Sequence, residues 1–278
     1  MVGSPALSRP HLPSAHHTMS ASSAFLPVLI LHTGDPHADI LASLGSYAQM
    51  LRRAAGLAPT SVEIVRVFED GVPRAPQAYS AVLVTGSPEN VTDGAEWGER
   101  TAQWLREAAQ AGLPIFGICY GHQLLAHALG GRVDFNPAGR ETGTHDIELL
   151  PAGLDDPLLD GLPTVFPAQM QHMQTIVTLP PGAVSLARSG KDDNQLVRMG
   201  DRILSSQFHP EFEQDVPRAD IARRGAEYAD EGLDVPELVS NIRPTPEAAS
   251  LVRRFLALYA PQVPLMPDPR EDLQPLAA

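Results

Sequence analysis

The first half of the chain alternates between two kinds of hydrophobic pattern. Short apolar runs closed by turn residues, such as LPVLILHTG (26–34) and LPIFGIC (113–119), are typical of buried parallel strands. Between such runs, segments such as AEWGERTAQWLREAAQAG (95–112) repeat apolar residues every three or four positions and end at a glycine, which indicates helices. Strands that alternate with helices at this spacing predict right-handed βαβ units and an α/β fold with a mostly parallel sheet.

Further segments of the first half extend this pattern. Strands are expected at SVEIVRVFED (61–70) and YSAVLVTGSPENV (79–91), and a helix is expected at YGHQLLAHALGG (120–131). Residues 38–56 predict one more helix, which stops at Gly56. Its apolar stripe consists of Leu41, Leu44, Tyr47, Leu51 and Ala54.

The second half is richer in strand patterns and predicts a mixed continuation of the same sheet with antiparallel additions. The charged stretch 213–244 contains helix-like segments, but the pattern does not determine their place in the fold. A closing helix is expected over 245–260, with Thr245 as its N-cap. Its apolar face consists of Leu251, Phe255 and Leu258.

Three regions follow from these patterns. Residues 1–24 are poor in large apolar side chains and predict a disordered N-terminal extension. They contain no continuous apolar run of the kind found in a secretory signal. Residues 25–262 predict one domain, and residues 263–278 predict a loose C-terminal tail. No run of about 18 apolar residues suggests a membrane span.

Charge and cysteine content narrow the classes of function. The chain of 278 residues has a net charge of −13 and no cluster of Lys and Arg, which argues against nucleic acid as a partner. A single cysteine excludes an internal disulfide and cysteine-based metal clusters, and it fits a reducing compartment. We therefore expect a cytoplasmic protein that uses neither a metal nor another cofactor and that binds no membrane.

The single cysteine, Cys119, lies between Gly117 and Gly121 at a predicted strand–turn–helix junction. This is the arrangement of a nucleophile elbow, in which glycines let the backbone pack closely around a strained nucleophile. The N-terminus of the following helix favours thiolate over thiol, and the backbone N–H of Tyr120 is available to an oxyanion. The alternative is a buried structural thiol, which the flanking glycines disfavour.

A cysteine nucleophile needs a base and a group that orients the base. The segment SSQFHPEFEQ provides His209 and Glu211, whose side chains project to the same side of an extended segment. Pro210 helps to keep the segment extended. Upstream, the T-G-S-P turn can direct backbone N–H groups near Gly86 into the site. Taken alone, the H-P-E segment is equally compatible with a surface turn, and the T-G-S-P segment is more typical of an ordinary βα turn.

The three motifs together resemble the class I (triad) glutamine amidotransferases, including the glutaminase domain of GMP synthetase. The resemblance covers residues from about 28 to 212. It implies a flavodoxin-like three-layer α/β/α fold with Cys119 as nucleophile, His209 as base and acid, and Glu211 as the residue that orients His209. It also implies an oxyanion hole from the backbone N–H groups of Gly86 and Tyr120. Gln123 matches a substrate-binding position.

The implied reaction is hydrolysis of the glutamine side-chain amide through a cysteinyl thioester. The sequence departs from the synthetase pattern in QMQHMQT, where His172 is kept but Gln174 replaces an acid. No acceptor domain follows the glutaminase motifs, so we expect a stand-alone domain with a small-molecule substrate that delivers ammonia to a separate synthase.

Other functions remain open at this point. The same triad could hydrolyse another γ-glutamyl amide, such as a peptide or amine conjugate. The chain could instead be an inactive regulatory binding module, which its intact Cys, His and Glu disfavour. A DJ-1/PfpI-like protein also has an elbow cysteine, but the late H-P-E sequence disfavours that class. The sequence does not determine the oligomeric state.

Overall fold

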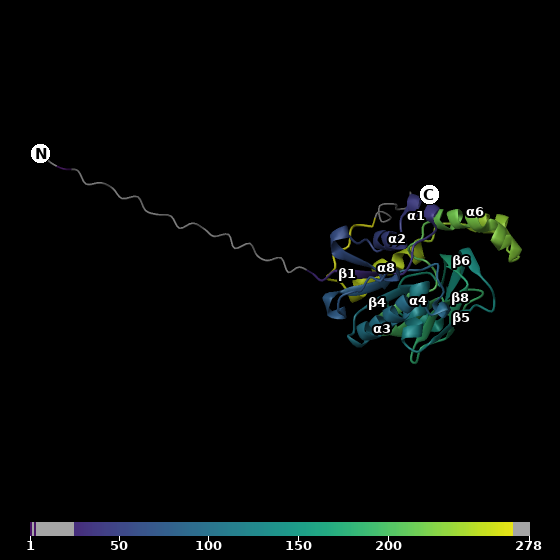
Figure 1. Ribbon diagram of the computed structural model, residues 1–278, viewed down its shortest axis with the longest axis horizontal. Coiled ribbons are helices and arrows are strands. Elements are labelled where there is room, and N and C mark those ends of the chain that lie inside the picture. Colours follow the sequence, from purple (N-terminus) through teal and green to yellow (C-terminus); the bar gives the residue numbers. More distant parts are fainter. Residues whose placement is uncertain (2, 4–24, 269–278) are drawn as a thin grey trace.

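A central sheet of nine strands organises the described part of the chain (Figure 1). The described residues form eleven strands in all: β1 (Val28–His32), β2 (Val62–Arg66), β3 (Ala81–Val84), β4 (Ile115–Ile118), β5 (Arg132–Phe135), β6 (Glu141–Leu149), β7 (Val165–His172), β8 (Gln174–Thr178), β9 (Val184–Arg188), β10 (Leu196–Gly200) and β11 (Ile203–Ser206). Their order in the large sheet is β2-β1-β3-β4-β11-β10-β9-β6-β7, and β5 pairs with β8 in a separate ribbon.

Helices connect and cover these strands. They are α1 (Ala38–Leu44), α2 (Tyr47–Ala54), α3 (Glu96–Gln110), α4 (Tyr120–Ala128), α5 (Pro151–Leu154), α6 (Asp215–Asp230), α7 (Val235–Asn241) and α8 (Pro246–Tyr259). Short 3₁₀ helices are η1 (Pro59–Ser61), η2 (Val67–Glu69), η3 (Pro76–Ala78) and η4 (Val91–Asp93).

The structure is a computed structural model that describes residues 1, 3 and 25–268. The extension predicted for residues 1–24 lies outside the described residues except at positions 1 and 3, and so does 269–278 of the predicted tail. The remaining part of that segment runs along Gly56 and Leu57, since Met266 N donates to Gly56 O at 2.7 Å. None of the described helices has the length and apolar character required to cross a membrane.

The large sheet has a parallel half and an antiparallel half. Strands β2, β1, β3, β4 and β11 pair in parallel. Strands β10, β9, β6 and β7 continue the sheet with antiparallel pairings. The predicted α/β class and the predicted antiparallel continuation are therefore both confirmed.

Side chains of the parallel strands alternate between two helical layers, as the pleat requires. Ile30, Leu83 and Phe116 face α2 and α8, where they pack in one apolar core. Leu31 and Val84 face α3 and α4 in a second core. The result is the predicted three-layer α/β/α arrangement.

The predicted single helix over 38–56 is wrong, because the segment forms two helices. Gly45 ends α1 with a φ of 94°, and Ser46 starts α2 with a capping box. The Ser46 hydroxyl accepts from Gln49 N at 3.2 Å, and Gln49 Oε1 accepts from Ser46 N at 2.9 Å. The break changes the buried face of α1, so Ile40 is buried whereas Leu41 is exposed.

The stretch 213–244, which the sequence left unplaced, forms α6 and α7. Helix α6 lies beside α1 at one end of the molecule (Figure 1). Its first turn joins a small apolar cluster with the α1–α2 segment, through Tyr47, Phe212 and Val216. Farther along, Ile221 and Tyr228 pack against residues of α7. This pair of helices therefore forms a wall at the edge of the sheet.

Candidate active site

The site lies where adjacent parallel strands end. Strands β3, β4 and β11 are neighbours in the sheet, so their carboxyl ends share one edge. Gly86 follows β3, Cys119 follows β4 and His209 follows β11. The topology therefore brings together three positions that are far apart in the sequence.

Cys119 has a strained backbone. Its φ is 51° and its ψ is −103°, and Asp70 is the other non-glycine residue with a positive φ among those described. Such a conformation costs on the order of 1–3 kcal/mol, and it persists only where the surroundings impose it. Cys119 N donates to Ser206 O at 2.8 Å, which ties the strained turn to β11.

The two glycines that flank the turn permit a close crossing of the strand and the helix. A methyl group on Gly117 would lie 2.5 Å from the carbonyl oxygen of Gly121. A methyl group on Gly121 would lie 2.7 Å from the carbonyl oxygen of Val84. No L side chain fits either contact without a backbone shift, in agreement with the elbow expected from the sequence.

His209 is fixed by three contacts. Its Nδ1 lies 2.9 Å from Glu211 Oε1, and its backbone N–H donates to Gln169 O at 2.9 Å. Its ring stacks on Phe212 with the centroids 3.9 Å apart. The two residues are buried, with 3% of His209 and 5% of Glu211 exposed. The other ring nitrogen, Nε2, has no hydrogen-bond partner among the described residues.

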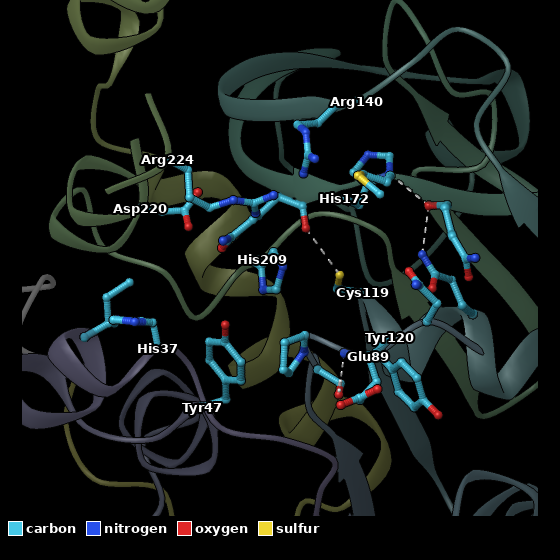
Figure 2. Close-up of a pocket in the computed structure, with 18 of the residues that line it drawn as sticks. His37, Tyr47, Glu89, Cys119, Tyr120, Arg140, His172, His209, Asp220 and Arg224 are labelled. Carbon is cyan, nitrogen blue, oxygen red and sulfur yellow. Dashed lines mark hydrogen bonds between the residues drawn. The ribbon is translucent and has the colours of Figure 1, made fainter. Parts of the chain in front are cut away.

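Cys119 and His209 line the same cavity, whose walls are shown in Figure 2. Both residues are close to Gly86, where an added methyl would lie 3.6 Å from Cys119 Cβ and 3.0 Å from His209 Cε1. The Cys119 sulfur is 3.7 Å from Gln171 O. Burial lowers the pKa of His209, but the charges of Glu211 and Cys119 outweigh it and raise the pKa to about 10.

The backbone N–H groups predicted for an oxyanion hole are free. Within the described part of the chain, neither Gly86 N nor Tyr120 N donates to another protein group. Tyr120 is the first residue of α4, where an N–H group has no partner within the helix. Tyr120 follows Cys119 directly, and a methyl group on Gly86 would lie 3.6 Å from Cys119 Cβ, so both residues are near the cysteine side chain.

Gln123 lines the cavity one turn into α4, but its amide nitrogen is occupied. Nε2 donates to Gln174 O at 2.8 Å and to Gln207 Oε1 at 3.0 Å. Its direct role toward a substrate is thus restricted to the carbonyl end of the side chain, and its amide end holds Gln174 and Gln207 in place.

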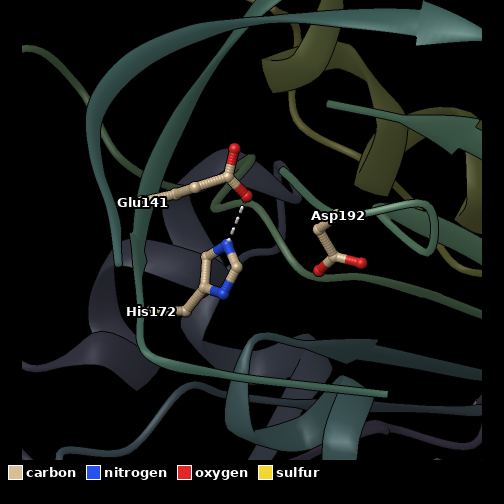
Figure 3. Close-up of side chains that lie close together, drawn as sticks. All are labelled: Glu141, His172 and Asp192. Carbon is tan, nitrogen blue, oxygen red and sulfur yellow. Dashed lines mark hydrogen bonds and ion pairs between the residues drawn. The ribbon is translucent and has the colours of Figure 1, made fainter. Parts of the chain in front are cut away.

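His172 also lines the cavity, and behind it lies a buried polar cluster (Figure 3). One side-chain nitrogen or oxygen atom from each of Glu141, His172 and Asp192 lies within 4.8 Å of the other two. Hydrogen bonds engage these groups, since His172 Nε2 is 3.0 Å from Glu141 Oε2 and Thr175 donates to Asp192 at 2.6 Å.

The two acids of this cluster differ in their surroundings. Burial raises the pKa of Glu141, but the hydrogen bond and charge of His172 outweigh burial and leave the pKa below its ordinary value. Burial raises the pKa of Asp192. Gln174, the residue that departs from the synthetase pattern, donates from its side chain to Thr92 Oγ1 at 2.5 Å.

Several cavity residues were missed by the sequence analysis. The cavity has a volume of about 220 Å³, below the roughly 300–1,000 Å³ of pockets for drug-sized ligands. The missed residues come from the α1–α2 segment, the start of β6 and helix α6; they include Tyr47, Arg140, Asp220, Arg223 and Arg224. The spacing of Asp220, Arg223 and Arg224 places them on one helical face, which was the available sequence signal.

Known proteins resemble this chain in sequence and in fold. Residues 40–227 match the family model described as "Glutamine amidotransferase class-I". A protein of Aeropyrum pernix named GMP synthase [glutamine-hydrolyzing] is 32% identical over 66% of this chain and 32% of its own length. A protein of the same name from Thermomicrobium roseum is 34% identical over 72% of this chain and 34% of its own length.

The chain thus spans about a third of the length of these two relatives. Among solved structures, a glutamine amidotransferase from Thermotoga maritima superposes with a TM-score of 0.68 at 21% identity. The match covers 85% of this chain and 98% of that one, which shows a common fold.

Proposed function

The chain belongs to the class I glutamine amidotransferase family, and on this basis we propose that it hydrolyses the side-chain amide of glutamine or of another γ-glutamyl compound. The proposal rests mainly on the hydrogen bonding of the two ring nitrogens of His209. Its Nδ1 is held by Glu211 at 2.9 Å, while its buried Nε2 is unpartnered among the described residues, in the cavity that also exposes Cys119.

In the first half of the proposed reaction, Cys119 attacks the amide carbon. The negative oxygen that forms is stabilised by the N–H groups of Gly86 and Tyr120. The raised pKa of His209 means that the imidazolium is present at neutral pH. We propose that Cys119 attacks as a thiolate, which the N-terminus of α4 favours. His209 therefore donates its Nε2 proton to the departing nitrogen as the C–N bond breaks, which leaves a γ-glutamyl thioester on Cys119.

In the second half, water replaces the amine. His209, now neutral, accepts a proton from water as the oxygen attacks the thioester carbon. The C–S bond breaks, glutamate leaves and the thiolate–imidazolium pair is restored. Glu211 holds His209 Nδ1 throughout and keeps Nε2 directed at the reacting atoms.

When glutamine is the substrate, we propose that the released ammonia is used by a separate synthase. The names of the two relatives support this class of partner, because both are called glutamine-hydrolysing synthases. The reaction also requires a reduced Cys119, which supports a cytoplasmic location for the protein.

The test is release of ammonia and glutamate from glutamine by the purified chain. Cys119→Ala should abolish turnover, and His209→Ala should reduce it by several orders of magnitude. Glu211→Gln should reduce it less, since an orienting residue is less critical than the acid–base residue. Turnover by Cys119→Ala at the rate of the unmodified chain would disprove the mechanism.

A further inference from the structure

The leaving group of the proposed reaction must lie on the His209 side of Cys119, because His209 protonates the departing nitrogen. In Figure 2, Tyr47 and Asp220 lie on that side, whereas Tyr120 and Glu89 lie on the other. The Phe212 ring contacts both Tyr47 and His209. It stacks on the imidazole and lies 5.8 Å from the Tyr47 ring, measured between centroids. The α1–α2 segment and α6 therefore form the wall that a leaving group meets.

Arginine side chains are frequent around the cavity, although the whole chain is acidic. The whole chain carries −13, yet the cavity is lined by three arginines and two acids. The arginines are Arg140, Arg223 and Arg224, and the acids are Glu89 and Asp220. An arginine in this wall can attract an anionic group only where acids of the chain do not already satisfy its guanidinium.

Two of the three arginines are already neutralised. Arg140 donates to Glu231 at 2.7 Å and to Glu227 at 3.0 Å. Arg224 donates to Glu227 at 2.8 Å. The bonds of Arg140 fix α6 to the start of β6, and both guanidinium groups are already paired with Glu227 or Glu231.

Arg223 differs from its two neighbours. Within the described part of the chain, its guanidinium makes one long hydrogen bond, at 3.4 Å to Asp220 Oδ1, and its side chain is 38% exposed. Asp220 is almost fully buried and also accepts a hydrogen bond from the Tyr228 hydroxyl. Asp220 thus anchors one edge of the Arg223 guanidinium, and the other N–H groups remain available.

Tyr47 adds a neutral donor beside this cation. Its hydroxyl forms no hydrogen bond with the described residues, although the side chain is buried in the cavity wall. Burial and the charges of Cys119 and Asp220 raise the pKa of Tyr47, so the hydroxyl keeps its proton. A polar group at the leaving-group position would therefore meet a cationic donor, Arg223, and a neutral donor, the Tyr47 hydroxyl.

Resting on the proposed function, we propose that Arg223 binds a carboxylate on the leaving amine, so that the preferred substrates are γ-glutamyl amino acids or peptides rather than glutamine itself. The amide C–N bond breaks as the Cys119 thioester forms, and the His209 proton goes to the nitrogen of the released amino acid. Water then hydrolyses the thioester to glutamate. No further reactant is required.

A matched pair of substrates isolates the carboxylate. γ-Glutamylglycine and γ-glutamylmethylamide have the same scissile bond and differ in the carboxylate of the leaving amine. For the full-length chain, kcat/KM should be roughly 10- to 100-fold higher for γ-glutamylglycine, as expected for a charge-assisted hydrogen bond. Arg223→Ala should reduce this preference to near 1, and Arg223→Lys should keep part of it.

Arg218→Ala is the control, since Arg218 lies on the same helix, does not line the cavity and donates to Ile242 O at 3.2 Å. It should preserve the preference. An unchanged preference in Arg223→Ala, or hydrolysis of glutamine with neither γ-glutamyl conjugate, would overturn the inference and leave the proposed function intact. Failure to hydrolyse any γ-glutamyl compound would overturn both.

Discussion

The backbone of Gly86 lies close to both Cys119 and His209. A methyl group there would lie 3.0 Å from His209 Cε1, so Gly86→Ala should displace the imidazole. A misplacement of about 1 Å can reduce a rate on the order of 10²-fold, and we expect a loss of that size in kcat/KM with little change in Tm. Steady-state kinetics and a thermal melt measure the two quantities.

Gly190 offers a matched control for this substitution. It is exposed, its φ is not positive and an added methyl would have nothing within 4 Å. Gly190→Ala should therefore leave kcat/KM and Tm unchanged. Full activity in Gly86→Ala would contradict the contact between Gly86 and the imidazole.

The pKa of His209 leads to a second prediction at the scale of a single residue. With a pKa raised to about 10, the imidazolium persists through neutral pH and loses its proton only as the pH rises toward that value. Thioester formation requires this proton, so kcat/KM should stay level above neutral pH and fall as the pH nears 10. A pH–rate profile and the NMR titration of His209 test this expectation.

Titration of His209 in the Cys119→Ser variant tests whether the thiolate raises the pKa of His209. The substitution removes the thiolate charge that raises the pKa of His209, so the imidazole should lose its proton at a lower pH in this variant. Identical titration curves with and without the thiol would show that Cys119 and His209 do not form an ion pair.

At the scale of elements, the capping box at Ser46 determines where α2 begins and thereby positions Tyr47. Ser46→Ala removes the hydroxyl that accepts from Gln49 N, and loss of an N-cap costs about 1 kcal/mol of stability. Chemical denaturation should show this decrease. Ser43→Ala, at an exposed position of α1, should show a smaller one. Equal values would indicate that the cap does not stabilise the segment.

The sequence was informative about elements wherever the pattern was local. Strand–turn–helix units around Gly86 and Cys119 were predicted because buried parallel strands and glycine turns leave a strong local pattern. The break at Gly45 was missed because the apolar positions on either side maintain a helical spacing. Thr245 was expected to cap α8, but its side chain forms no capping hydrogen bond, and Leu258 is exposed.

The position of helix α6 could not be predicted from the sequence. Its position is determined by contacts with distant parts of the chain, such as the ion pairs of Arg140 with Glu227 and Glu231. No local pattern predicts such contacts, so the sequence did not indicate that Arg223 and Asp220 line the same cavity as Cys119. The cavity wall that faces the leaving group became visible only in the folded chain.

At the scale of the whole molecule, strand order joins the parts of the site. The adjacency of β3, β4 and β11 brings Gly86, Cys119 and His209 to one edge, although β11 follows β4 only after the whole antiparallel half of the sheet. The sequence supported these three residues through motif chemistry rather than through topology. The pairing of β6, β7 and β9 was not predicted, because such pairings depend on non-local contacts.

The covalent intermediate tests the central claim most directly. Rapid quenching of the full-length chain with glutamine or γ-glutamylglycine, followed by intact-mass and peptide mass spectrometry, should detect a γ-glutamyl group on Cys119. The adduct should be absent in Cys119→Ala, and it should disappear as the substrate is exhausted. Turnover without any adduct on Cys119, or an adduct on another residue, would contradict the proposed mechanism.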